Sequence, residues 1–308
     1  MPVAAAVASL PYVVGFIVWQ LSTLAMFVAM VRSVLPGRAT LVTIAAIGFP
    51  ATFSTLGHGH NAFLTAALLG SGLLLLDRRP VIAGVLFGLL AYKPQFGILL
   101  PLVLVLLGQW KAIASASVTV IVMAVGVTLA YSFDIWPAFL AGTEFTRTAV
   151  LELGATGWSK IQSVFSAARS FGLPVSVAYM AQAVSTLFVL GALSAMCIAR
   201  CDFRLIAAAT AGGALLATPY CLDYDMTILG VAIAFSVAHA LDRGFAPYQA
   251  TLLVAVWAVP LIARSGMAVT GIPIGVVVMA IFFGSIVHRA FAEAPSGSIL
   301  DHWRVARG

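Results

Sequence analysis

The 308-residue sequence has little charge: charged residues make up 8% of it and hydrophobic residues 62%. A globular protein in water typically has roughly 25% charged residues. Ten acids and sixteen bases are too few to cover a soluble surface of this size. Disordered chains are excluded as well, because they are rich in charge and poor in apolar residues. The composition therefore predicts a polytopic membrane protein.

Cysteines and clustered bases are also scarce. The three cysteines, Cys197, Cys201 and Cys221, form neither a disulfide framework nor a metal-binding spacing. Cys197 and Cys201 lie one helical turn apart at the end of an apolar run, and we interpret these two as small core residues. The bases occur singly or in pairs, and no basic run is present that could follow a nucleic-acid backbone. We therefore expect no nucleic-acid partner. No Lys or Arg precedes Arg32, so the basic start of a signal peptide is missing.

Long apolar runs fill most of the chain, and they are continuous rather than alternating, which favours helices over a barrel. The sequence predicts an all-α transmembrane bundle of about eleven spans. It forms one domain over 1–288, with a loop at 132–174 and a cytoplasmic tail at 289–308. Several runs are shorter than the ~20 residues that cross about 30 Å of hydrocarbon. The predicted spans are 9–31, 41–56, 61–76, 81–92, 96–109, 112–131, 175–199, 205–218, 226–240, 250–263 and 271–288.

The distribution of bases favours one topology. If the chain reverses at Lys93-Pro94, eleven of the sixteen bases lie on one side of the membrane. If 81–109 is a single span, the bases divide eight to seven and Lys93 lies in hydrocarbon. The positive-inside rule favours the reversal, with the eleven bases in the cytoplasm. Pro94 also disfavours helix at Lys93.

Loop 132–174 then lies on the outer side. Within it, Ile161, Val164, Phe165 and Ala168 have the spacing of one helix face, which predicts a helix over 160–172. That helix either lies in the outer membrane interface or packs against the bundle.

Several short runs end on the outer side next to polar residues, which predicts a polar cavity there; unusually tilted short helices are the alternative. Lys93 is a lone cation between two apolar runs, and such a cation needs an anion. Its partner is either an acid of the protein, Asp223 or Asp225, or the phosphate of a substrate. The outer polar groups are Gly57-His58-Gly59-His60-Asn61, Tyr92-Lys93-Pro94-Gln95, residues of the long loop, and Thr218 to Asp225.

Asp223 and Asp225 are candidates for a general base, or they neutralise Lys93. His58 and His60 are candidates for hydrogen bonding to a polar substrate, and capping of two helix ends is the alternative. A metal bound by both histidines and one of the aspartates is possible but not favoured, because an H-x-H turn alone is a weak signal. We predict no cofactor. These residues fit an enzyme that acts on a lipid-linked substrate, and they also fit a transporter.

Some of these stretches resemble a known family. The segment Gly59-His60-Asn61 through Leu68, the segment Asp77 to Pro80, Ala83-Gly84, and Leu89 through Gln95 are similar to the central signature of glycosyltransferase family 87. Its members are GT-C-type membrane enzymes, and the characterised ones transfer mannose from polyprenyl-phosphate mannose. The resemblance runs from about Leu10 to Asp225 and beyond, and it is most specific at 57–101.

Two departures affect what the resemblance implies. Family members usually have Gln at the position of His60. GT-C enzymes also have a catalytic acid in the first outer loop, whereas no acid precedes Asp77 here, and our topology puts Asp77 in the cytoplasm. We therefore expect the chain to be truncated at its N-terminus.

The resemblance implies hexosyl transfer from a polyprenyl-phosphate sugar to a hydroxyl of a glycolipid or glycan acceptor. The expected place is the outer, periplasmic face of a bacterial plasma membrane. A transporter or flippase of a lipid-linked or small polar substrate, or an inactive truncated transferase, remains the alternative. The expected roles are a base for the hydroxyl (Asp223, Asp225), a site for the donor phosphate (Lys93, His58, His60), and the lining of the sugar or acceptor site (Asn61, Gln95, Tyr224).

Overall fold

A computed structural model describes residues 7 and 9–294 of the chain. This part is helical and has no strand, and its one isolated β-bridge joins Ile161 to Leu222. The α-helices are α2 (Tyr12–Val34), α3 (Ala39–Ile47), α4 (Pro50–His58), α5 (Ala62–Leu75), α6 (Pro80–Leu89), α7 (Pro94–Gly97), α8 (Leu100–Leu106), α9 (Trp110–Tyr131), α10 (Ile135–Phe145), α11 (Val164–Ser170), α12 (Val175–Ile198), α13 (Phe203–Leu216), α14 (Leu229–Arg243), α15 (Gln249–Thr270) and α16 (Ile274–Ala292). The 3₁₀ and π segments are η1 (Leu90–Tyr92), η2 (Thr146–Glu152), η3 (Trp158–Lys160) and η4 (Asp223–Ile228).

Each of the eleven predicted runs is mostly helical, so the all-α class is confirmed. The count of eleven spans is not confirmed. Among the described residues, six helices are long and apolar enough to cross a membrane, and α3 with α4 makes a seventh if this pair, bent by 52°, is one span. Four apolar stretches are shorter: Ala62–Leu75, Pro80–Tyr92, Pro94–Leu106 and Phe203–Leu216.

The short helices α5 and α13 lie inside the bundle. All residues of α13 from Leu205 to Leu216 are buried, and ten residues of α5 are buried too. By contrast, the long helix α9 buries only Ala112. A helix surrounded by other helices does not need to match the thickness of the bilayer, so these two helices can be short and rich in small residues.

The chain reverses at Lys93, as predicted. Helix α6 continues into η1, which ends at Tyr92. Pro94 is the first residue of α7, a position at which a backbone N–H has no acceptor within the helix, so proline is tolerated there. Gly108 and Gln109, which follow α8, line the same cavity of about 490 Å³ as Asp77, which precedes α6. Helix α8 therefore returns to the level where α6 began. The segment 81–109 is therefore a helical hairpin and not a single span.

Helix α6 packs against α9 through small residues. Gly84 faces the Ala112 carbonyl and Ser115, and Gly88, one turn later, faces Ala116 and Thr119. Two glycines four residues apart let the backbones of membrane helices approach closely. This contact anchors the otherwise exposed α9 to the bundle.

Polar contacts join α13 to α14, and α16 to α15 and the loop before it. The Arg204 guanidinium pairs with Asp242, and Arg289 donates to Gln249 and to the Gly244 carbonyl. The predicted boundary of the tail at 289 falls inside α16, which continues to Ala292 because Arg289 is held by these contacts. The rest of the predicted tail, 295–308, lies outside the described residues.

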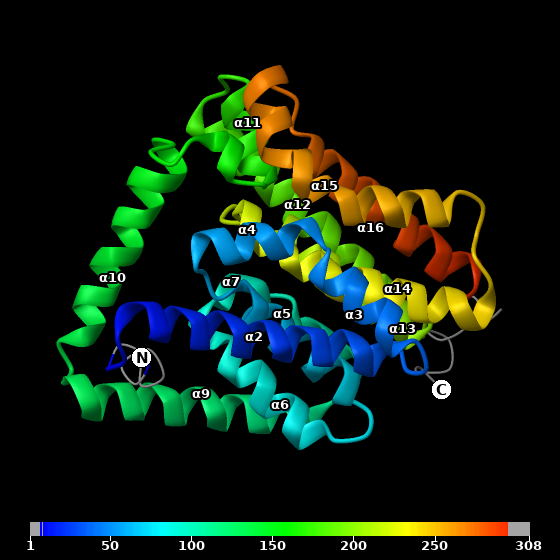
Figure 1. Ribbon diagram of the computed structural model, residues 1–308, viewed down its shortest axis with the longest axis horizontal. Coiled ribbons are helices and arrows are strands. Elements are labelled where there is room, and N and C mark those ends of the chain that lie inside the picture. The colour runs from blue at the N-terminus through cyan, green and yellow to red at the C-terminus, as the bar shows by residue number, and fades with distance from the viewer. Residues whose placement is uncertain (1–6, 8, 295–308) are drawn as a thin grey trace, which may run out of the picture.

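The loop at 132–174 is mostly helical, which the sequence analysis predicted only for 160–172. Helix α10 buries no residue and crosses beside the bundle between α9 and α11 (Figure 1). Helix α11 covers part of the predicted helix. Its residues Phe165 and Ala168, and Ile161 before it, pack with Ala178 of α12. Of the two interpretations of this stripe, packing against the bundle is the one that the structure shows.

Candidate active site

The candidate site lies where several short helices end. Segment η4 contacts α4, α5, α13, α14 and α15, and it carries both candidate aspartates. Helix α4 ends at His58, and Gly59 caps it. Gly59 has φ +68 and lies against Phe16, so a side chain is excluded there by conformation and by space. This turn places His58 and His60 beside η4.

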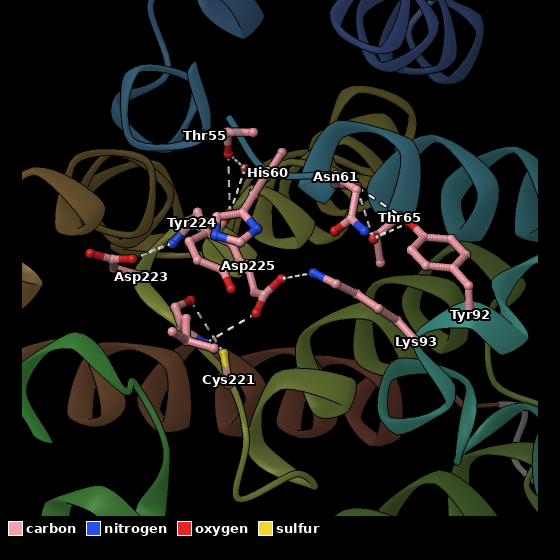
Figure 2. A network of polar contacts seen from close by, with 12 residues as sticks. Thr55, His60, Asn61, Thr65, Tyr92, Lys93, Cys221, Asp223, Tyr224 and Asp225 are labelled. Carbon is pink, nitrogen blue, oxygen red and sulfur yellow. Dashed lines mark hydrogen bonds and ion pairs between the residues drawn. The ribbon is translucent and has the colours of Figure 1, made fainter. Parts of the chain in front are cut away.

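A buried ion pair is the centre of the site. Lys93 Nζ lies 2.7 Å from Asp225 Oδ1, and the two side chains are 14% and 1% exposed (Figure 2). The second oxygen of Asp225 accepts the Leu222 N–H at 3.1 Å. The protein therefore supplies the anion that the lone Lys93 requires, and only one of its three ammonium donors is used.

Asp223 faces a different cation. One of its oxygens accepts the Tyr224 N–H at 2.9 Å, and the other lies 3.2 Å from Arg264 of α15. The Arg264 side chain is 50% exposed, while that of Asp223 is 6% exposed. Asp223 thus lies at the edge of the site, whereas Asp225 is sealed beneath Lys93.

An aromatic stack covers the ion pair. The His60 ring stacks on Tyr224 with centroids 4.0 Å apart, and Lys93 Nζ lies 5.2 Å from the Tyr224 centroid. His58 lies nearby, with its ring 6.2 Å from that of His60. Partial burial of the otherwise exposed His60 ring lowers its pKa below the usual 6.5, and Lys93 and His58 lower this pKa further. His60 is consequently a neutral, exposed imidazole at neutral pH.

Asn61 lies beside the ion pair. The amide oxygen of its side chain is buried without a hydrogen-bond partner, whereas its backbone carbonyl accepts from Thr65 and Tyr92. A buried amide oxygen of this kind is available to a water molecule or a substrate hydroxyl. Gln95 is half-buried in α7, and its side chain makes no hydrogen bond within the described residues.

The long loop closes one side of the site. The Gln162 N–H donates to the Cys221 carbonyl at 2.6 Å, next to the Ile161–Leu222 bridge. Lys160, in the adjacent η3, is one of the charges that lower the pKa of His60. Cys221 is fully buried, and this burial, together with Asp225, raises the pKa of its thiol. That thiol stays protonated and is not a nucleophile.

The structure brings together seven of the eight predicted site residues, all except Gln95. The sequence analysis missed Arg264 as a site residue, although a lone base at the end of an apolar run is the same signal that identified Lys93. Within residues 7 and 9–294, no three His, Cys, Asp or Glu side chains lie close enough to hold a metal ion.

A family comparison identifies the chain. The model of glycosyltransferase family 87 matches residues 2–219, which is more than two thirds of the sequence. The chain belongs to glycosyltransferase family 87. No curated protein and no solved structure matches it. The match includes His58, His60, Asn61 and Lys93 and ends four residues before Asp223.

Membership of family 87 indicates a membrane glycosyltransferase. The geometry of the site is suited to such chemistry, because glycosyl transfer needs a base for the attacking hydroxyl and positive charge for the leaving group. Carboxylates, a neutral imidazole and three bases (Lys93, Lys160 and Arg264) lie around one buried turn.

Proposed function

We propose that this family 87 protein transfers a hexosyl group, mannose being our first choice, from a polyprenyl phosphate to an acceptor hydroxyl. The reaction takes place at the outer face of a bacterial plasma membrane, and the acceptor is a glycolipid or glycan. The observation that carries the proposal is the buried Lys93–Asp225 pair beside the exposed His60 and the half-exposed Arg264.

In this reaction the acceptor oxygen attacks the anomeric carbon, and the bond from that carbon to the phosphate oxygen breaks. The electron pair of the broken bond stays on the phosphate. Lys93, whose ammonium has two donors left, stabilises this charge, and Asp225 holds it in position. His58 and His60 flank the phosphate from the α4–α5 turn.

Asp223 accepts the proton of the hydroxyl. Asp225 lies buried beneath Lys93, whereas Asp223 pairs with the exposed Arg264, so an acceptor can reach Asp223 from the edge of the site. The unpartnered Asn61 amide oxygen and the face of Tyr224 are suited to contact sugar hydroxyls or the sugar ring.

The test uses the purified chain in liposomes with radiolabelled polyprenyl-phosphate mannose and a glycolipid extract. We expect a labelled glycolipid product and free polyprenyl phosphate, both lost in Lys93→Ala. Full transfer by Lys93→Ala would refute the role of Lys93 in binding the phosphate. Movement of label across the bilayer without a covalent product would instead favour a transporter.

A further inference from the structure

A narrow apolar cavity of about 300 Å³ lies between α2, α3 and α14, and we call it the α2–α14 slot. Its lining follows each helix in order, from Phe27 to Leu35 along α2 and from Gly230 to Leu241 along α14. Phe49, where the chain bends between α3 and α4, lies at the same end as Phe27 and Gly230. The slot is therefore elongated and follows the helix axes.

The length of the slot matches one leaflet of a bilayer. From Gly230 to Leu241 the helix rises by eleven steps of 1.5 Å, which is about 16 Å. This is roughly half of the ~30 Å hydrocarbon core. One extended lipid chain that enters from the membrane surface would fill such a cavity.

The structure holds the slot open. Helix α3 forms one wall of the slot. Helix α4 turns away from this wall, because the chain bends by 52° between α3 and α4. Trp257 of α15 fixes that wall, because its indole N–H donates to the Ala45 carbonyl at 3.0 Å. The slot is thus lined by several packed helices, and it opens to the surface where its lining residues Leu41, Leu241 and Phe245 are exposed.

The other end of the slot is basic. Arg38 is the only charged residue in the lining, it is exposed, and no acid of the described chain pairs with it. Arg32 and Ser33 line a second cavity, of about 430 Å³, on the other side of Leu35. Two bases, Arg32 and Arg38, therefore lie at the mouth of the slot, and no carboxylate among the described residues pairs with either of them.

We infer that the slot binds one acyl chain of an anionic phospholipid, with the lipid phosphate between Arg38 and Arg32. Packing of the chain against the lining helices supplies van der Waals contact, since the chain is already out of water in the bilayer, and a base near an anionic lipid contributes about 1 kcal/mol. The slot lies at the basic end of α2, and its lining does not include Lys93, His60 or the aspartates. Lipid binding there is a property separate from sugar transfer.

The experiment measures which lipid stays bound to the purified chain. The chain is placed in nanodiscs of phosphatidylcholine with a minor share of phosphatidylglycerol, and the retained lipids are identified by native mass spectrometry after transfer to detergent. We expect one phosphatidylglycerol in excess of its share in the nanodisc. Arg38→Gln should lower its retention about five-fold, which is the factor that corresponds to one such base.

Two further variants make the test specific. Ala46→Leu fills the slot and should remove the retained lipid, even if its greater volume lowers the stability somewhat. Arg78→Gln removes another exposed base that does not line the slot, and it should leave retention unchanged. Equal retention of both lipids, no effect of Arg38→Gln, or retention of polyprenyl phosphate instead of a phospholipid would overturn the inference. None of these readouts depends on glycosyl transfer.

Discussion

At the scale of residues, the Lys93–Asp225 pair shows how a charge is accommodated in an apolar bundle. Removing one partner of a buried ion pair leaves the other charge buried and uncompensated. This lowers the free energy of unfolding more than replacing both partners together does. The ion pair consequently has a structural role, and activity measurements alone cannot separate this role from binding of a phosphate.

The first prediction separates the two roles. Lys93→Met should lower the free energy of unfolding by about 3–5 kcal/mol, because Asp225 is left charged and buried. Lys93→Met/Asp225→Asn should recover most of this loss, since the pair is then neutral and Asn still accepts from Leu222. Unfolding in a single detergent measures both effects, and transfer activity should stay absent in the double variant. A double variant no more stable than Lys93→Met would contradict the structural role.

The second prediction concerns His60, whose pKa is lowered by burial and by nearby bases. Lys160→Gln should raise this pKa, because one repelling charge is removed. Asp223→Asn should lower it further, because an attracting charge is lost. NMR titration of labelled histidine measures both shifts, and shifts in the same direction would contradict the placement of these charges around His60.

The pH dependence of stability follows from the same lowered pKa. Between this pKa and 6.5, the unfolded state binds more protons at His60 than the folded state does. His60 therefore contributes to a loss of stability as pH falls through 6.5. His60→Gln should remove this contribution, which is small because the side chain is exposed.

At the scale of elements, the close approach of α6 and α9 depends on two glycines. Gly84→Leu should force the helices apart, because its side chain would meet the Ala112 carbonyl and Ser115. Overpacking of this kind typically costs about 1–3 kcal/mol. Thermal unfolding in detergent measures the loss. Gly126→Leu, on α9 with nothing within 4 Å, is the matched control and should be neutral or stabilising.

The candidate site also depends on elements that are distant in the sequence. The turn after α4, the reversal at Lys93 and segment η4 meet because α5 and α13 between them are short and buried. The sequence indicated each polar group separately. It could not pair Lys93 with Asp225, because 132 residues separate them and a spacing rule applies only within one element.

At the scale of the whole molecule, the positions of the bases predict the topology. Cysteines introduced at Arg78 and at Arg147 should react with a membrane-impermeant thiol reagent from opposite sides, Arg147→Cys from outside. Both positions are exposed, whereas the three native cysteines are buried and should give little background. Labelling of both positions from the same side would refute the predicted reversal across the membrane.

The sequence alone determined that the chain is a helical membrane protein, because apolar runs without charge have no other stable arrangement in lipid. It also determined the reversal at Lys93-Pro94, because proline interrupts a helix locally. The tertiary structure decided which acid neutralises Lys93, that Arg264 pairs with Asp223, and that an elongated slot lies between α2, α3 and α14. These contacts depend on how helices pack side by side, and packing is set by the shapes of several helices together and not by the periodicity of any one of them.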